Sequence, residues 1–211
     1  MKKLLAVLAG SAAALLAGCG GGGGGGGGTT QQLAGDSGSA SPLAAYIGTW
    51  QSACDHHDRQ SLVIAFKSDG SGSLELTPTG ETYFKADCSG PVVATDSISA
   101  KITGKPDGTA DMLIKLAENA AATSLRVDKI TSSAPAYTFQ RTGTTVKYVL
   151  RENKQQWCVD VDNGESCLWD EGMQAAQSIP GGLSLRGNDL YTVMLDTEKG
   201  VYVLDMHYVK K

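Results

Sequence analysis

The sequence lacks the short motifs that carry much of known catalytic chemistry. It has no Gly-rich phosphate loop, no Gly-x-Ser-x-Gly nucleophile elbow and no His-Glu-x-x-His metal motif. Carboxylates are plentiful, with 22 Asp and Glu residues, but a linear sequence does not show which of them face one another. We therefore expect no enzymatic activity and no cofactor.

The chain also has no excess of basic residues. It carries 18 Lys and Arg against 22 Asp and Glu, for a formal net charge of −4, and it has no basic patch with interleaved aromatic residues. Proteins that bind nucleic acid usually concentrate positive charge on one surface. The composition therefore argues against a nucleic-acid partner.

The apolar segment at the N-terminus is too short to span a membrane as a helix. Lys2 and Lys3 precede an uncharged stretch of 14 residues, 4–17. A spanning helix needs roughly 20 apolar residues, whereas about 10–14 suit the core of a signal peptide. We therefore predict that residues 1–18 are a removable signal peptide.

The end of this segment carries a second signal. Leu16-Ala17-Gly18-Cys19 resembles the lipobox of bacterial lipoproteins, with an aliphatic residue three places before the cysteine and small residues between them. The resemblance implies that Cys19 becomes the first mature residue and carries acyl chains such as palmitate, which attach it to a membrane. Gly20 stands where lipoproteins of the inner membrane usually have an acidic residue. The resemblance therefore implies a lipid anchor in the cell outer membrane, with the domain facing the periplasm.

A low-complexity tract separates this anchor from the rest of the chain. Glycine fills positions 20–28, and mainly small and polar residues continue to residue 41. Such a segment cannot bury a core, so we expect residues 19–41 to be the lipidated cysteine and a flexible linker. Residues 42–211 have the usual length of one domain.

Four cysteines remain in this domain: Cys54, Cys88, Cys158 and Cys167. An even number in an exported chain indicates two disulfides, for which three pairings exist. Sequence proximity favours Cys54–Cys88 and Cys158–Cys167. The Asn163-Gly164 turn signal lies between the second pair, which indicates a hairpin closed by a disulfide. A four-cysteine zinc site is disfavoured because the C-x₂₋₄-C spacing is absent.

The hydrophobic pattern of the domain repeats every second residue, which is typical of half-buried strands. We expect strands at 62–67, 74–77, 97–102, 112–116, 125–130, 137–140, 146–150, 157–161, 191–195 and 201–209. Turn signals include Asp69-Gly70, Thr79-Gly80, Asp107-Gly108, Thr142-Gly143, Gly181-Gly182, Gly187-Asn188 and Lys199-Gly200. Only residues 170–177 are predicted to form a short helix. The fold class predicted is all-β, an antiparallel meander barrel of about eight to ten strands, or a β-sandwich.

The start of the domain carries a further resemblance. Tyr46-Ile47-Gly48-Thr49-Trp50 is similar to the aromatic-x-Gly-x-Trp signature of lipocalins and the wider calycin barrels. The resemblance implies that Gly48 lets the chain turn into the first strand, that Trp50 plugs the closed end of the barrel, and that the barrel holds an apolar ligand. The alternative is that Trp50 is an ordinary core residue of another β-domain.

The last predicted strand supplies the candidate ligand-binding residues. Alternation places four of them on one face: Tyr202, Leu204, Met206 and Tyr208. It places Asp205 on the opposite face. The same pattern is typical of a filled core, and a closed eight-strand barrel exists in both forms.

Two of the three histidines are adjacent, at His56 and His57. Neighbouring residues of a strand point to opposite faces, so these two share a metal only in a loop, and a third ligand such as His207 would be needed. We predict a solvated loop and no metal site. Asp160-x-Asp162-Asn163-Gly164 departs from the EF-hand pattern and is predicted to be a turn.

These features predict a non-enzymatic lipoprotein with one of two roles. The first is a binding module whose barrel holds a small apolar or amphipathic ligand. The second is an interaction protein that recruits an envelope protein. A cavity favours the first role, and an exposed apolar or aromatic patch favours the second.

Overall fold

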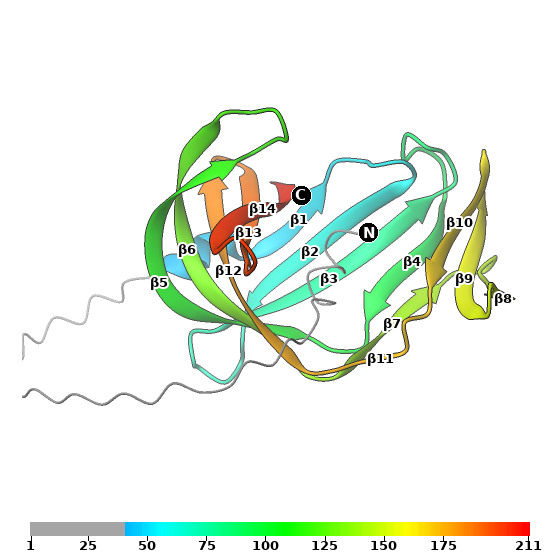
Figure 1. Ribbon diagram of the computed structural model, residues 1–211, viewed down its shortest axis with the longest axis horizontal. Helices are drawn as coiled ribbons and strands as arrows, with labels where there is room; N and C mark the ends of the chain where they lie inside the picture. The colour runs from blue at the N-terminus through cyan, green and yellow to red at the C-terminus, as the bar shows by residue number, and fades with distance from the viewer. Residues whose placement is uncertain (1–40) are drawn as a thin grey trace, which may run out of the picture.

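The computed structural model describes residues 41–211, so the predicted signal peptide, Cys19 and the linker up to residue 40 lie outside the described residues. The described part consists of strands joined by turns, with one short 3₁₀ helix (Figure 1). Its elements are η1 Pro42–Tyr46, β1 Gly48–Ser52, β2 Asp58–Phe66, β3 Leu74–Tyr83, β4 Val92–Ile98, β5 Ile102–Lys115, β6 Ala122–Ala134, β7 Tyr137–Thr142, β8 Lys147–Arg151, β9 Lys154–Val161, β10 Gly164–Trp169, β11 Met173–Gln174, β12 Gln177–Arg186, β13 Asp189–Asp196 and β14 Val201–Lys210. Within these residues, no helix has the length and apolar character needed to cross a membrane.

Eight of the strands form a ring, in the order β3-β2-β1-β14-β13-β12-β6-β5, with β5 returning to pair with β3. All of these pairings are antiparallel. Neighbours in the ring follow one another in the chain except at β1–β14, which joins the first and last strands, and where β4 and β7 to β11 are inserted. The closing pairing is short, because only residues 74–76 of β3 meet 102–104 of β5. The ring is therefore not evenly closed as a barrel. The predicted all-β antiparallel fold is confirmed.

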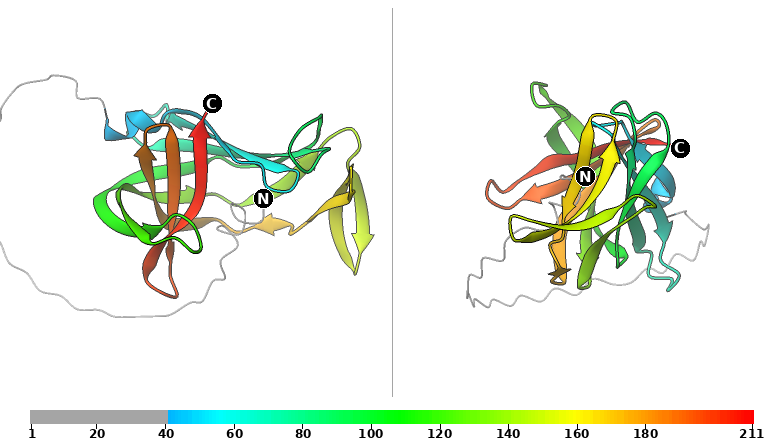
Figure 2. Two further views of the ribbon diagram at one scale, coloured as in Figure 1. Left: turned by 90° about the horizontal axis from the view of Figure 1, so that it is seen from above. Right: turned by 90° about the vertical axis from the view of Figure 1, so that its right-hand side faces the viewer.

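The inserted strands extend the sheet away from the ring. β4 pairs with residues 79–83 of β3, β7 pairs with β4, and β11 pairs with β7. Three further strands form a separate sheet in the order β10-β9-β8. This three-stranded sheet stands at the end of the extension that is farthest from the ring (Figure 2).

The ring strands bury two apolar clusters on opposite faces. The inner cluster comprises Leu43, Tyr46, Trp50, Leu62, Ile64, Leu74, Leu76, Ile102, Ile130, Ala134, Tyr137, Phe139, Leu183, Leu190 and Tyr208. The outer cluster comprises Ile114, Leu125, Val127 and Val193, with Met112, Leu116, Tyr191, Tyr202 and Leu204 packed against it. Leu190 and Val193 of β13 belong to different clusters because side chains alternate across a strand. The long β5–β6 hairpin curves around β12 to β14 and supplies most of the outer cluster (Figure 1).

Two glycines in the middle of β12 lie close to atoms of the two strands that pair with it, β6 and β13. A Cβ atom added to Gly182 would lie 2.3 Å from Cγ1 of Val127, and one added to Gly181 would lie 2.8 Å from the carbonyl oxygen of Val193. The predicted turn at Gly181-Gly182 is therefore wrong. A side chain at either position would collide with a neighbouring strand, which explains why both residues are glycine.

Other local predictions are also corrected. Residues 170–177 form no helix, because β11 lies within them and pairs with Thr138 and Tyr137 of β7. The predicted strand 97–102 is divided between the end of β4 and the start of β5. Thr79-Gly80 lies inside β3, and Asp107-Gly108 forms a bulge inside β5.

Both predicted disulfides are present. Cys54 and Cys88 have Cα atoms 5.8 Å apart, and Cys158 and Cys167 have Cα atoms 4.1 Å apart. The second pair occupies directly opposite positions of β9 and β10, so it closes a hairpin as predicted. The turn of this hairpin precedes Gly164, which has a φ of +143°.

Candidate functional site

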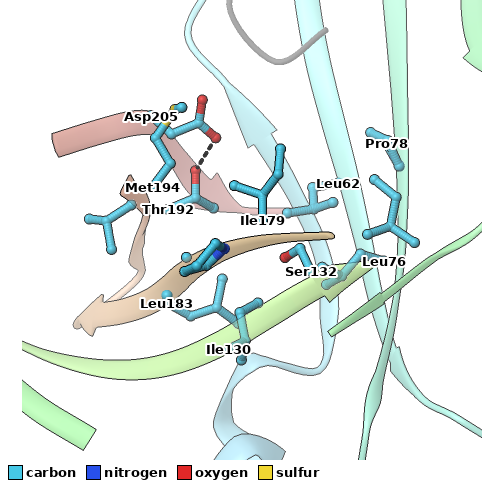
Figure 3. A pocket seen from close by; sticks show the side chains of 15 residues that line it. Leu62, Leu76, Pro78, Ile130, Ser132, Ile179, Leu183, Thr192, Met194 and Asp205 are labelled. Carbon is cyan, nitrogen blue, oxygen red and sulfur yellow. Dashed lines mark hydrogen bonds between the residues drawn. The ribbon is translucent and has the colours of Figure 1, made fainter. Parts of the chain in front are cut away.

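The ring contains a cavity of about 100 Å³ (Figure 3). Its lining is mainly aliphatic and includes Leu62, Leu76, Ile102, Ile130, Ile179, Leu183 and Met194. Three polar side chains complete it: Ser132, Thr192 and Asp205. An apolar cavity of about 150 Å³ holds benzene in another protein, so the size of this one suits a small molecule.

A bulge in β14 directs Asp205 into this cavity. Thr192 of β13 is opposite Met206, but the next pair is Val193 and Leu204, so Asp205 has no residue opposite it. The hydroxyl of Thr192 donates a hydrogen bond to Oδ2 of Asp205 at 2.9 Å, and the backbone N–H of Met206 donates to Thr192 Oγ1 at 3.1 Å. These contacts hold the carboxyl group in a defined position at the cavity wall (Figure 3).

The charged form of Asp205 is disfavoured in this position. Burial raises the pKa of its carboxyl group from an ordinary value of 3.8 to about 6, and the hydrogen bond from Thr192 opposes the rise only in part. The nearby phenol of Tyr208 is also fully buried. Its pKa is raised well above the ordinary value, mainly by burial and further by the charge of Asp205.

The bulge also changes which predicted ligand-binding residues share a face. Met206 and Tyr208 pack with the inner cluster, whereas Tyr202 and Leu204 pack with the outer cluster. The prediction that the four share one face is therefore wrong, because the extra residue shifts the alternation of β14 by one position. Asp205, predicted to lie on the opposite face, lines the cavity instead.

The aromatic-x-Gly-x-Trp segment fixes η1 against the ring. Trp50 is 1% exposed, and its indole N–H donates to the carbonyl oxygen of Tyr46 at 2.7 Å. The hydroxyl of Tyr46 lies 2.7 Å from Oδ2 of Asp128 and 3.0 Å from the carbonyl oxygen of Leu183. Gly48 has a φ of +138°, which agrees with the prediction that the chain turns there into its first strand.

A larger and more polar cleft of about 640 Å³ lies beside β10 and the start of β2. Most of its polar side chains are already engaged with other protein groups. Asp58 accepts a hydrogen bond from Thr82 at 2.8 Å, and His207 lies 2.6 Å from Oδ1 of Asp189. These contacts stabilise the walls of the cleft.

Arg141 provides the strongest of these wall contacts. Its guanidinium group donates two hydrogen bonds to the carboxylate of Asp96, at 2.7 and 2.8 Å. It also donates to Thr82 Oγ1 at 3.2 Å and to the carbonyl oxygen of Ser166 in β10 at 3.1 Å. Burial raises the pKa of Asp96, although Arg141 opposes this change. The pair therefore joins the three-stranded sheet to the main sheet, and no sequence pattern indicates it because the partners are far apart in the chain.

Among the described residues, the histidines do not gather with other metal-ligating side chains. His56 is exposed beside Asp55, as predicted, but His57 is buried, with its ring nitrogens 3.2 Å from the carbonyl oxygen of Tyr83 and 3.0 Å from Oδ1 of Asn163. The predicted solvated loop is therefore wrong for His57, which contacts the turn of the β9–β10 hairpin. Within residues 41–211, one group of three side chains is close enough to hold a metal: Cys158, Glu165 and Cys167. Both of its cysteines are already bonded to each other.

No known protein family, curated protein or solved structure matches this chain.

Proposed function

We propose that the chain is an exported lipoprotein, anchored to the outer membrane through Cys19, whose ring of strands binds a small and mainly apolar ligand. The observation that supports this function best is the apolar cavity inside the ring, with its single carboxyl group. The larger cleft is a weaker candidate because most of its polar side chains are already paired with other groups of the protein.

The size of the cavity limits the ligand. Each buried CH₂ group contributes about 0.8 kcal/mol, so about five such groups contribute about 4 kcal/mol, which corresponds to a dissociation constant near 1 mM. Tighter binding requires a specific polar contact in addition to the apolar walls. Ser132, Thr192 and Asp205 are the side chains in a position to provide it.

The two disulfides support export. Structural disulfides persist in oxidising compartments, including the bacterial periplasm, and are rare in the cytosol. The lipobox resemblance adds the anchor, since several acyl chains on one cysteine give stable attachment to a membrane. The Gly-rich tract then gives the domain freedom of movement close to that membrane.

The proposal is tested by native mass spectrometry of the mature lipoprotein, released gently from membranes and compared with its denatured mass. We expect a small bound species in the native spectrum that is lost on denaturation. Ser132→Leu fills the cavity and should abolish the bound species, whereas Ser133→Leu on the other face of β6 should retain it. A bare native protein would contradict the proposed function, as would equal occupancy in both variants.

An exposed apolar surface favours the second candidate function, recruitment of an envelope protein. Tyr148 and Leu150 of β8 are 53% and 64% exposed, and the ring of Tyr148 lies 5.3 Å from that of Trp157. β8 pairs only with β9 among the described strands, so its other edge is open to a further strand. Crosslinking in intact cells tests this role. A specific crosslinked product that is lost in Leu150→Lys and retained in Leu113→Lys would support it.

A further inference from the structure

Among residues 41–211, Asp205 is the only ionisable side chain that lines the cavity of the ring. Its Oδ2 accepts the hydrogen bond from Thr192, and no other described residue donates a hydrogen bond to this carboxyl group. Figure 3 shows the carboxyl group beside Thr192 and Met194, at one side of an otherwise aliphatic space. Its Oδ1 therefore has no hydrogen-bond donor among the described residues.

The surroundings provide no positive charge to balance this carboxylate. Among the described residues, no Lys, Arg or His side chain lines the cavity, and the charge of Asp205 adds to the rise of the pKa of Tyr208. A buried carboxylate without a partner is costly, whereas a paired and hydrogen-bonded one is tolerated. A positively charged ligand group would supply the missing partner, and an anionic group would add repulsion.

We infer that the ligand is a small apolar primary amine, whose ammonium group binds Oδ1 of Asp205 while its hydrocarbon part lies against the aliphatic wall. This inference rests on the proposed function, because it requires that the cavity bind ligands. The Thr192 hydroxyl and the Met206 N–H orient the carboxylate before the ligand arrives. This preorganisation reduces the cost of binding.

The carboxylate of Asp205 also disfavours other classes of small apolar ligand. Short fatty acids have the right apolar part, but at neutral pH their carboxylate would face that of Asp205. Alcohols of the same shape donate one neutral hydrogen bond, which is weaker than a charge-assisted one. The expected order of affinity is therefore amine, then alcohol, then hydrocarbon, with the carboxylic acid excluded.

The experiment compares three compounds of nearly equal shape on the mature lipoprotein in detergent at pH 7.5. These are cyclopentylamine, cyclopentanol and methylcyclopentane, and binding is followed by the methyl NMR signals of Ile130 and Leu183. We expect the amine to bind at least about tenfold more tightly than either of the other two compounds. Asp205→Asn should remove this preference and retain the binding of methylcyclopentane. Asp107→Asn changes an exposed carboxylate and should leave the preference intact.

The outcomes separate the two proposals. If all three compounds bind equally to the natural protein, or if the amine preference survives in Asp205→Asn, the amine inference is wrong and the cavity remains a binding site. If the alcohol binds best, the ligand is a neutral donor and the inference is again wrong. If none of the three shifts the signals of the natural protein, the proposed function itself fails.

Discussion

Thr192 and Asp205 are joined by a hydrogen bond of 2.9 Å across a bulge in the β13–β14 pair. The bulge has two effects on the ring. It directs an acidic side chain into an apolar cavity, and it moves Tyr202 and Leu204 from the inner face of β14 to the outer cluster. One extra residue therefore determines both the chemistry of the cavity and the packing of the layer behind it.

The half-buried carboxyl group of Asp205 makes stability depend on pH. Its pKa is about 6 in the folded protein against an ordinary value of 3.8, so the folded state binds the proton more tightly than the unfolded state does. Stability should therefore fall as the pH rises through this window and stay constant above it. The difference of about two pKa units corresponds to about 3 kcal/mol at neutral pH.

Asp205→Asn removes this dependence and keeps an acceptor for Thr192. We expect the variant to be more stable than the natural protein by up to about 3 kcal/mol at pH 7 and nearly equal to it at pH 4. Urea unfolding at both pH values measures the free energy of unfolding of each protein. Subtracting the value of the natural protein from that of the variant cancels the contributions of other titrating groups. A difference that does not grow between pH 4 and pH 7 would show that the carboxyl group is not buried as described.

The Arg141–Asp96 pair is expected to be a major stabilising contact. Arg141→Ala leaves the buried carboxylate of Asp96 without its cation and should destabilise the domain by about 3–5 kcal/mol. The double variant Arg141→Ala with Asp96→Ala should lose less stability than the two single variants lose together, because it leaves no unpaired charge.

The matched control is Arg151→Ala, which removes an exposed ion pair with Glu165 in the three-stranded sheet. It should change the free energy of unfolding by less than about 1 kcal/mol. Hydrogen exchange gives a second measurement. Exchange in β10 should accelerate in Arg141→Ala because the contact with Ser166 is lost. Equal destabilisation by the two variants would contradict this account.

Gly182 is expected to tolerate no side chain. Gly182→Ala places a Cβ 2.3 Å from Cγ1 of Val127, so β12 and the β5–β6 hairpin must move apart. Overpacking of this kind costs about 1–3 kcal/mol. Gly182→Ala should cost less stability in a protein that already carries Val127→Ala than in the natural protein. Thermal unfolding of the natural protein, the two single variants and the double variant measures this difference. If Gly182→Ala costs the same stability with and without Val127→Ala, the clash with Val127 is not the cause of the loss.

Local patterns in the sequence predicted much of the fold. Alternation located most strands, and proximity along the chain paired Cys54 with Cys88 and Cys158 with Cys167. These signals are read from neighbouring residues, and the structure preserves them. The strand at 201–209 shows where they fail. A bulge leaves no mark in strict alternation, so Asp205 was predicted on the wrong face.

Other features depend on contacts between distant segments. Gly181-Gly182 has the composition of a turn, and only the packing of Val127 and Val193 explains why both glycines lie inside a strand. Arg141 and Asp96 each resemble ordinary surface residues of a half-exposed strand. Their burial results from the separate sheet of β8 to β10, whose position no local pattern predicts.

The proposed lipid anchor at Cys19 can be tested by substitution. Cys19→Ala should abolish labelling by palmitate and move the protein from the membrane fraction to the soluble periplasmic fraction or to the uncleaved precursor. The reason is that Cys19 is the proposed site of acylation and the proposed first residue of the mature chain. Cys54→Ser is the control, because Cys54 forms a disulfide within the domain and should not affect labelling. Palmitate labelling that persists in Cys19→Ala would contradict the anchor.

The most direct test of the binding function is a crystal structure of the protein under xenon pressure. Xenon enters apolar cavities that are dry and accessible. We expect one strong xenon site inside the ring, against Leu76, Ile130 and Leu183, that is lost in Ser132→Leu. Xenon absent from the ring and present only elsewhere would show that the interior is a filled core, and the proposed binding function would then be wrong.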